Sequence, residues 1–205
     1  MNQTGLLLLT GALATVSLTG ADHAFQLALL PPDTQLVGDT ESISGLRLNF
    51  YGRNANMRGF DFGLVNETSG EFHGFGIGLV NLVDGNATGV QWSFMGYGPI
   101  DGNAAGWQAA FVSDIGGTGN GLQSGCVVLT GKSFDGIQAG ILWSQTGEKI
   151  TGAQFGLVNK AGSVSGLQFG LVNLTEQMDG LQIGLWNRIS EKQSLSVLPL
   201  INWKF

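Results

Sequence analysis

Few residues of this chain have the type and spacing that chemistry requires. The segment GCVVLTGKS, residues 125–133, comes near the pattern of a phosphate-binding loop, but five residues separate its glycines where that loop has four. The single cysteine, Cys126, occupies an apolar position of a repeat with no base nearby. The two histidines, His23 and His73, form no cluster for a metal or a triad. We therefore predict that the protein is not an enzyme and holds no cofactor or metal.

Composition narrows the class of protein further. The chain has 205 residues, 34 of them glycine, with 43% apolar and 12% charged residues, which is typical of a folded chain. A net charge of −6 with nine Lys and Arg residues provides no basic surface, so we expect no nucleic-acid partner. One cysteine excludes an intramolecular disulfide framework.

The N-terminus has the pattern of a secretory leader. Residues 5–18 are an apolar stretch, and the small residues that follow permit cleavage after Ala21. No Lys or Arg precedes this stretch, although signal peptides usually carry one, so a buried strand is the alternative. We expect a signal peptide at residues 1–21, an N-terminal strand and linker at 22–44, and a repeat domain at 45–205.

Eleven similar units cover the chain from residue 45 to the C-terminus. The unit GLQFGLVN at residues 166–173 is representative, and the pattern recurs every 14 to 17 residues. The units open at Gly45, Gly59, Gly74, Gly89, Gly106, Gly121, Gly136, Gly152, Gly166, Gly180 and Ser194. Connectors rich in Gly, Asn, Ser and Asp separate them, which is turn chemistry. Because apolar residues alternate within each unit with a period of two, each unit is predicted to be one strand.

The alternation gives every strand two different faces. In the representative unit, Leu167, Phe169 and Leu171 share an apolar face, whereas Gln168 and Gly170 lie on a Gln/Gly face. No charged residue occupies the apolar face in any unit. We predict that the Gln/Gly face lines a lumen or meets water. Its glutamines are the candidate site residues Gln91, Gln108, Gln123, Gln138, Gln154, Gln168 and Gln182.

Two architectures shield such an apolar face. In a transmembrane β-barrel the apolar face meets lipid and the Gln/Gly face lines the lumen. In a β-solenoid we expect the apolar face to point inward and the Gln/Gly face to meet water. The opposite charges of Arg47 and Asp61, on the Gln/Gly faces of neighbouring units, could pair inside a lumen or form an exposed pair.

Three observations favour the barrel. Each unit allows a strand of about 9–10 residues, close to the roughly 9–11 that a barrel strand needs. Glycine is easier to explain on an inward face than on a solvent face. The ending SLSVLPLINWKF alternates through Ile201, Trp203 and the terminal Phe205, like the assembly signal of outer-membrane barrels.

With residues 24–32 as a further strand, the units predict an all-β, antiparallel membrane β-barrel of about twelve strands, each built from one repeat. The connectors lack the long alternate loops of surface barrels, which leaves the β-solenoid as the alternative fold.

The repeats also resemble those of a known family. GLRLNFYGRN at residues 45–54, GFDFGLVN at 59–66, GLQIGLWN at 180–187 and the ending LPLINWKF are similar to the bacterial GLQxGLVN surface-repeat family, first named from spirochaete surface proteins. The resemblance covers nearly all of the chain beyond the leader, although the units at Gly89, Gly106 and Gly121 lack the Leu-Val-Asn ending. It implies an exported, envelope-associated repeat protein, and the family has no established activity to transfer.

These observations lead to one expectation for function and one alternative. We expect a non-enzymatic protein of the bacterial outer membrane or cell surface, structural or weakly pore-like, with outer-membrane lipid and the barrel-assembly machinery as partners. The alternative is a periplasmic or secreted β-solenoid that binds a ligand through its Gln/Gly face.

Overall fold

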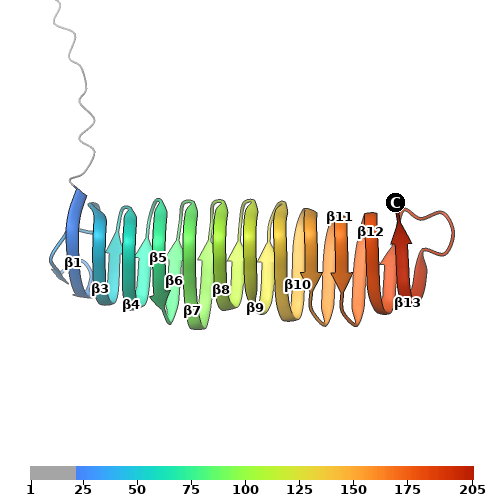
Figure 1. Ribbon diagram of the computed structural model, residues 1–205. Coiled ribbons are helices and arrows are strands. Elements are labelled where there is room, and N and C mark those ends of the chain that lie inside the picture. The colour runs from blue at the N-terminus through green and yellow to red at the C-terminus, as the bar shows by residue number, and fades with distance from the viewer. Residues whose placement is uncertain (1–21) are drawn as a thin grey trace, which may run out of the picture.

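The repeats stack in parallel along one axis, since each residue pairs with its equivalent one repeat later. Gly152, Gln154 and Phe155 pair with Gly166, Gln168 and Phe169, and the latter three pair in turn with the next repeat. The computed structural model describes residues 22–205, which form an elongated β-solenoid with β1 at one end of the stack and β13 at the other (Figure 1).

Thirteen strands make one continuous sheet that winds around the solenoid axis. In chain order they are β1 (Asp22–Leu30), β2 (Thr34–Gln35), β3 (Ser42–Asn54), β4 (Met57–Thr68), β5 (Phe72–Gly78), β6 (Val80–Val83), β7 (Ala87–Ile100), β8 (Ala104–Ile115), β9 (Gly119–Thr130), β10 (Phe134–Phe155), β11 (Val158–Phe169), β12 (Val172–Ile189) and β13 (Val197–Lys204). Neighbours are parallel from β1 and β3 through β12, whereas β2 and β13 pair antiparallel at the two ends.

The predicted closed barrel is therefore wrong, and the alternative β-solenoid is confirmed. A barrel of single-strand repeats requires antiparallel neighbours, whereas these repeats run parallel and in register. Each repeat makes one full turn of the solenoid, so it returns the chain to the same position one strand spacing further along. A unit need not be one straight strand: in the representative unit β11 ends at Phe169, the chain bends at Gly170 and Leu171, and β12 begins at Val172.

The two faces of the strands are oriented oppositely to the solenoid expected from the sequence, in which the apolar face points inward. The Gln/Gly face points inward, and the apolar face points outward. The apolar part of the interior comes from residues near the connectors. It consists of Val37, Ile43, Met57, Phe72, Val83, Ala87, Ile100, Ile115, Phe134, Ile150, Ala161, Val164, Met178 and Ile189.

The opening glycines form a column along the solenoid. Ten of them, from Gly45 to Gly180, have positive φ, with Gly166 at 137°. A Cβ atom on Gly166 would overlap the carbonyl oxygen of Gly152 one turn earlier. Both the backbone conformation and the close approach of successive turns therefore require glycine at this position.

The N-terminal prediction falls largely outside the structure. The signal peptide expected at residues 1–21 lies outside the described residues, and residues 22–44 hold β1, β2 and the start of β3. Residues 22–205 contain no helix that is long and apolar enough to cross a membrane.

Candidate functional surface

The candidate glutamines lie in the interior, where they form a ladder of amide hydrogen bonds. From Gln123 onward, each side-chain Nε2 donates to the Oε1 of the glutamine one turn earlier, at 3.2, 2.9, 2.8, 2.7 and 2.8 Å along the series to Gln182. The seven side chains are 0–5% exposed. The glutamines are therefore structural groups that a partner outside the solenoid does not reach.

A second ladder uses the asparagine that ends the repeat. Asn159 Nδ2 donates to Asn173 Oδ1 at 2.8 Å, and Asn173 Nδ2 donates to Asn187 Oδ1 at 2.7 Å. This ladder runs opposite to the glutamine ladder, because here each amide donates to the following turn. Sequence reasoning missed it, although the recurring Asn in Leu-Val-Asn was its signal.

Arg47 and Asp61 stand in place of glutamine at the third position of the units that open at Gly45 and Gly59, and they form a buried ion pair. Arg47 Nε donates to Asp61 Oδ1 at 2.8 Å, and Nη2 donates to Oδ2 at 2.6 Å. Arg47 Nη1 also donates to the Glu67 carbonyl oxygen at 2.8 Å. Both side chains are essentially unexposed. This bidentate geometry satisfies two charges that would otherwise be costly to bury.

The residues with potential chemistry are not brought together. His23 Nε2 lies 3.5 Å from a Glu41 oxygen, and His73 Nε2 lies 4.0 Å from a Glu71 oxygen, all partly exposed. Within residues 22–205, no three side chains of the His, Cys, Asp and Glu types gather where they could hold a metal. Most of GCVVLTGKS belongs to strand β9, so it does not form a loop around a phosphate.

The outer surface carries the most distinctive arrangement, which we call the apolar edge. It comprises the outward residues at the second, fourth, sixth and seventh positions of each turn, counted from the opening glycine. Its two central rows, at the fourth and sixth positions, are Leu48, Phe50, Phe62, Leu64, Ile77, Leu79, Trp92, Phe94, Ala109, Phe111, Ser124, Cys126, Ala139, Ile141, Phe155, Leu157, Phe169, Leu171, Ile183 and Leu185. Many of these are well exposed, for example Phe169 at 52% and Leu171 at 48%.

Charged residues lie on the other side of the solenoid. Between Gly45 and Lys192, every charged residue except the buried Arg47 and Asp61 occupies the ninth or a later position of its turn. Equivalent positions stack because the turns are in register. The exterior is therefore divided lengthwise into an apolar side and a polar side.

Tryptophan and tyrosine gather on the apolar edge. Of the seven, only Trp92 lies in a central row. The other six lie in register with the second or seventh positions, at the flanks of the edge. They are Tyr51, Tyr97, Trp107, Trp143, Trp186 and Trp203.

On the seventh-position flank, the polar tips of these rings point toward the charged side. Tyr51 donates to a Glu67 carboxylate oxygen at 2.5 Å, and Tyr97 donates to Asp114 at 2.9 Å. The hydrogen bond to Glu67 raises the pKa of Tyr51, with burial adding to it. Partial burial, followed by the hydrogen bond to Asp114, raises the pKa of Tyr97. Both rings therefore stay neutral with their hydroxyls anchored among polar groups.

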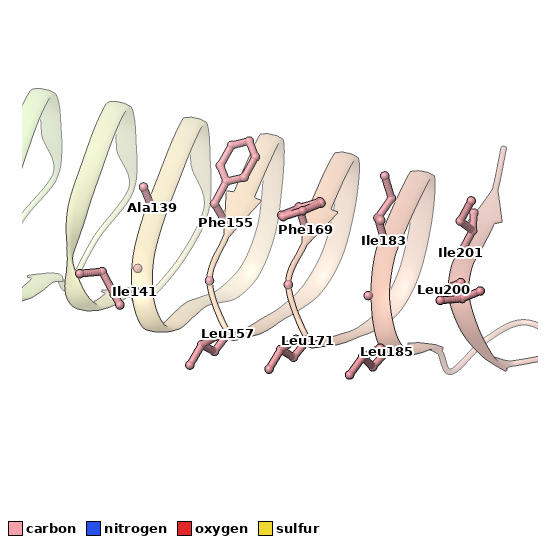
Figure 2. Close-up of a pocket in the computed structure, with 14 residues that line it drawn as sticks. Ala139, Ile141, Phe155, Leu157, Phe169, Leu171, Ile183, Leu185, Leu200 and Ile201 are labelled. Atoms are coloured by element: carbon pink, nitrogen blue, oxygen red, sulfur yellow. The ribbon is translucent and has the colours of Figure 1, made fainter.

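An apolar groove follows the edge near the C-terminal end (Figure 2). It has a volume of about 800 Å³ and lies between the fourth-position and sixth-position rows of successive turns. Glycines at the fifth positions form its floor. They are Gly140, Gly156, Gly170 and Gly184.

The predicted assembly signal continues the apolar edge. Ile201 and Trp203 lie on β13 and pair with Ile183 and Leu181 of β12. Ile201, Trp203 and Phe205 are exposed, with Phe205 at 88%. The sequence predicts them to be an assembly signal for an outer-membrane barrel, and a solenoid has no barrel for such a signal to assemble.

Fold and surface together define a β-solenoid repeat protein with a polar amide interior and an apolar outer edge. Comparisons with protein-family models, curated proteins and solved structures give no match. The similarity to the surface-repeat family thus stays a prediction from the sequence.

Proposed function

We propose that the protein is a non-enzymatic, envelope-associated β-solenoid that lies on a lipid surface through its apolar edge. The division of the exterior into an uncharged apolar side and a charged side carries this proposal. Thirty large hydrophobic side chains of residues 22–205 are exposed. Most of them belong to the apolar edge or continue it at the chain ends.

The area of the apolar edge indicates that a partner normally covers it. The ten opening glycines are separated by nine steps of about 4.8 Å, so the edge is about 43 Å long, and six residues at about 3.3 Å make it about 20 Å wide. The resulting area of about 850 Å² exceeds the roughly 300–600 Å² of the largest apolar patch on a typical monomer.

The distribution of aromatic residues favours lipid as that partner. Phe, Leu and Ile dominate the centre of the edge, whereas six of the seven Trp and Tyr residues lie at its flanks. Trp and Tyr are enriched where hydrocarbon meets lipid headgroups, because their rings are apolar and their tips are polar. Tyr51 and Tyr97 fit this arrangement, since their hydroxyls bond to carboxylates beside the edge. An edge of this kind suits shallow burial at the headgroup boundary of a bilayer.

The interior argues against the other functions that the sequence suggested. Within residues 22–205, stacked Gln, Asn and apolar side chains fill it, which leaves no lumen for a pore in this part of the chain. The same burial argues against ligand binding through the glutamines. An exported location on the bacterial envelope, as the resemblance implies, would place the apolar edge within reach of a membrane.

Flotation with phospholipid vesicles tests the proposal. The wild-type protein is expected to float with neutral vesicles, and the bound fraction should change little with salt, because the edge carries no charge. The double variant Phe169→Asp/Leu171→Asp should bind at least tenfold more weakly, because it places two charges against hydrocarbon. The matched control Ser163→Asp/Ser165→Asp adds the same charge near the connector and should float like the wild type.

Two results would overturn the proposal. One is a wild-type protein that stays unbound with vesicles of neutral and of anionic lipid. The other is an equal loss of binding in the two double variants, which would mean that added charge matters and its position does not.

A further inference from the structure

The groove on the apolar edge has banks made only of hydrocarbon. One bank carries the fourth-position residues and the other the sixth-position residues, and the two rows point away from each other (Figure 2). Every lining residue is Gly, Ala, Ile, Leu or Phe, so no lining side chain offers a nitrogen or oxygen atom. Phe155 and Phe169 lie on the fourth-position bank, and Leu157 and Leu171 lie on the sixth-position bank.

Backbone groups of Gly156 and Gly170 on the floor of the groove are already hydrogen-bonded within the solenoid, their carbonyl oxygens accepting from Asn159 Nδ2 and Asn173 Nδ2. Gly156 N donates to the Phe169 carbonyl oxygen at 3.2 Å, and Gly170 N donates to the Ile183 carbonyl oxygen at 3.0 Å. Leu157 N donates to Ile141 O at 3.1 Å in the same way. A strand added to a sheet gains its affinity from main-chain hydrogen bonds. Because the turns already use these groups, the groove suits an occupant that needs none.

The dimensions of the groove suit one hydrocarbon chain. From Ala139 to Ile201 the lining spans four strand spacings of about 4.8 Å, or about 19 Å. One leaflet of a bilayer contributes about 15 Å of hydrocarbon, which is half of the roughly 30 Å core. The groove is thus long enough to hold one acyl chain along the solenoid axis.

We propose that this groove binds a single acyl chain of a phospholipid from the membrane on which the solenoid lies. The inference rests on the proposed function, since the groove is part of the apolar edge. It adds a discrete site to that surface: one chain lies along the glycine floor between the rows of Phe169 and Leu171, while its headgroup stays at the polar flank.

Binding of a monomeric lipid separates this site from general adhesion to a bilayer. Titration with long-chain lysophosphatidylcholine below its critical micelle concentration should give saturable binding of one molecule per chain. A short-chain lysophosphatidylcholine should bind at least tenfold more weakly, because each buried methylene contributes about 0.8 kcal/mol. A free fatty acid with the same chain length tests whether the acyl chain comes from a phospholipid or from a free acid. If it comes from a phospholipid, the fatty acid should compete no better than the lysolipid.

A pair of variants locates the site. Leu171→Trp places a large ring in the groove and keeps the edge apolar, so it should weaken lysolipid binding at least tenfold and vesicle flotation much less. Leu64→Trp is the matched control, since Leu64 lies in the same sixth-position row and is similarly exposed, at 45% against 48%. Because Leu64 does not line the groove, this variant should leave lysolipid binding unchanged. If Leu171→Trp does not fold, as circular dichroism would reveal, Leu185→Trp in the next turn takes its place.

Each other outcome overturns the inference in a recognisable way. Flotation without saturable lysolipid binding leaves the proposed function standing and removes the site. Equal effects of Leu171→Trp and Leu64→Trp also remove it. Lysolipid binding without flotation rejects membrane lipid as the source, together with the proposed function. A stable dimer that lysolipid does not dissociate makes a second copy of the chain the occupant.

Discussion

Two single variants, Gln154→Leu and Leu157→Gln, test which side of the sheet is the core. The two side chains are of similar size and lie three residues apart in one turn. Gln154 is fully buried, and Leu157 is 44% exposed. Conventional soluble proteins bury leucine and expose glutamine, so they would respond in the opposite way from this solenoid.

The expected cost of Gln154→Leu follows from its hydrogen bonds. Gln154 Oε1 accepts from Gln168 Nε2 at 2.7 Å, and Gln154 Nε2 donates to Gln138 Oε1 at 2.8 Å. Gln138 Oε1 keeps a donor, the Thr146 hydroxyl at 2.7 Å. Gln168 Nε2 loses its acceptor and stays buried. One orphaned buried donor costs about 1–3 kcal/mol, and this is the expected loss in the free energy of unfolding.

The reverse exchange on the outside should be nearly neutral. Leu157→Gln adds a polar group to a position that already faces solvent, so in the absence of lipid its effect should stay within about 0.5 kcal/mol. Urea unfolding followed by circular dichroism measures both variants under the same conditions. If Leu157→Gln destabilises the protein more than Gln154→Leu does, the apolar face is the core and the reasoning is refuted.

Three further perturbations test the interior and the flank. Gly166→Ala should destabilise the fold by at least about 1–3 kcal/mol, because an L-residue must adopt a φ of 137° against the carbonyl one turn earlier. Asp61→Asn should cost about 3–5 kcal/mol in the free energy of unfolding, since it leaves the buried Arg47 charge without its partner; an unchanged urea midpoint would contradict the ion pair. The hydrogen bond to Glu67 raises the Tyr51 pKa above its usual value near 10. Its stabilising contribution is therefore full below about pH 10 and is lost as the pH rises through the raised pKa, and titration of tyrosinate absorbance in wild type and Tyr51→Phe measures it.

The period of two in the sequence correctly separates the faces of each strand but not their destinations. It groups Leu167 with Phe169 and sets Gln168 apart, as the structure does. The barrel prediction treats about nine residues as one straight strand, whereas the chain bends at the glycine in the fifth position, such as Gly170. Whether neighbouring units run parallel is a property of the whole turn. Alternation within one unit carries no information about it.

The apolar core could have been found in the sequence. Most units carry an apolar residue two positions before the opening glycine, such as Ile150, Val164 and Met178. These residues lie in the connectors, which the Gly, Asn, Ser and Asp content predicts to be loops. All three are nevertheless buried. Their recurrence at a fixed place indicates a stacked column, which only a parallel, in-register arrangement provides.

The burial of the glutamines is harder to predict from one sequence. A buried amide is costly when it is alone, but identical amides stacked in register satisfy one another. That compensation appears only when Gln154 lies directly beside Gln138 and Gln168. Once the ladder supplies a satisfied polar interior, the apolar residues are left to the outside, where they form the candidate functional surface.

A spin label on Cys126 tests most directly whether the apolar edge meets lipid. Cys126 is the only cysteine of the chain and lies in the sixth-position row of the edge, so no engineered site is needed. When neutral vesicles are added, the label should become accessible to oxygen and protected from a water-soluble paramagnetic reagent. A label at Lys132→Cys in a Cys126→Ser background, on the exposed connector, should stay accessible to that reagent. If the label on Cys126 remains as accessible to the water-soluble reagent with vesicles as without them, the apolar edge does not lie on lipid.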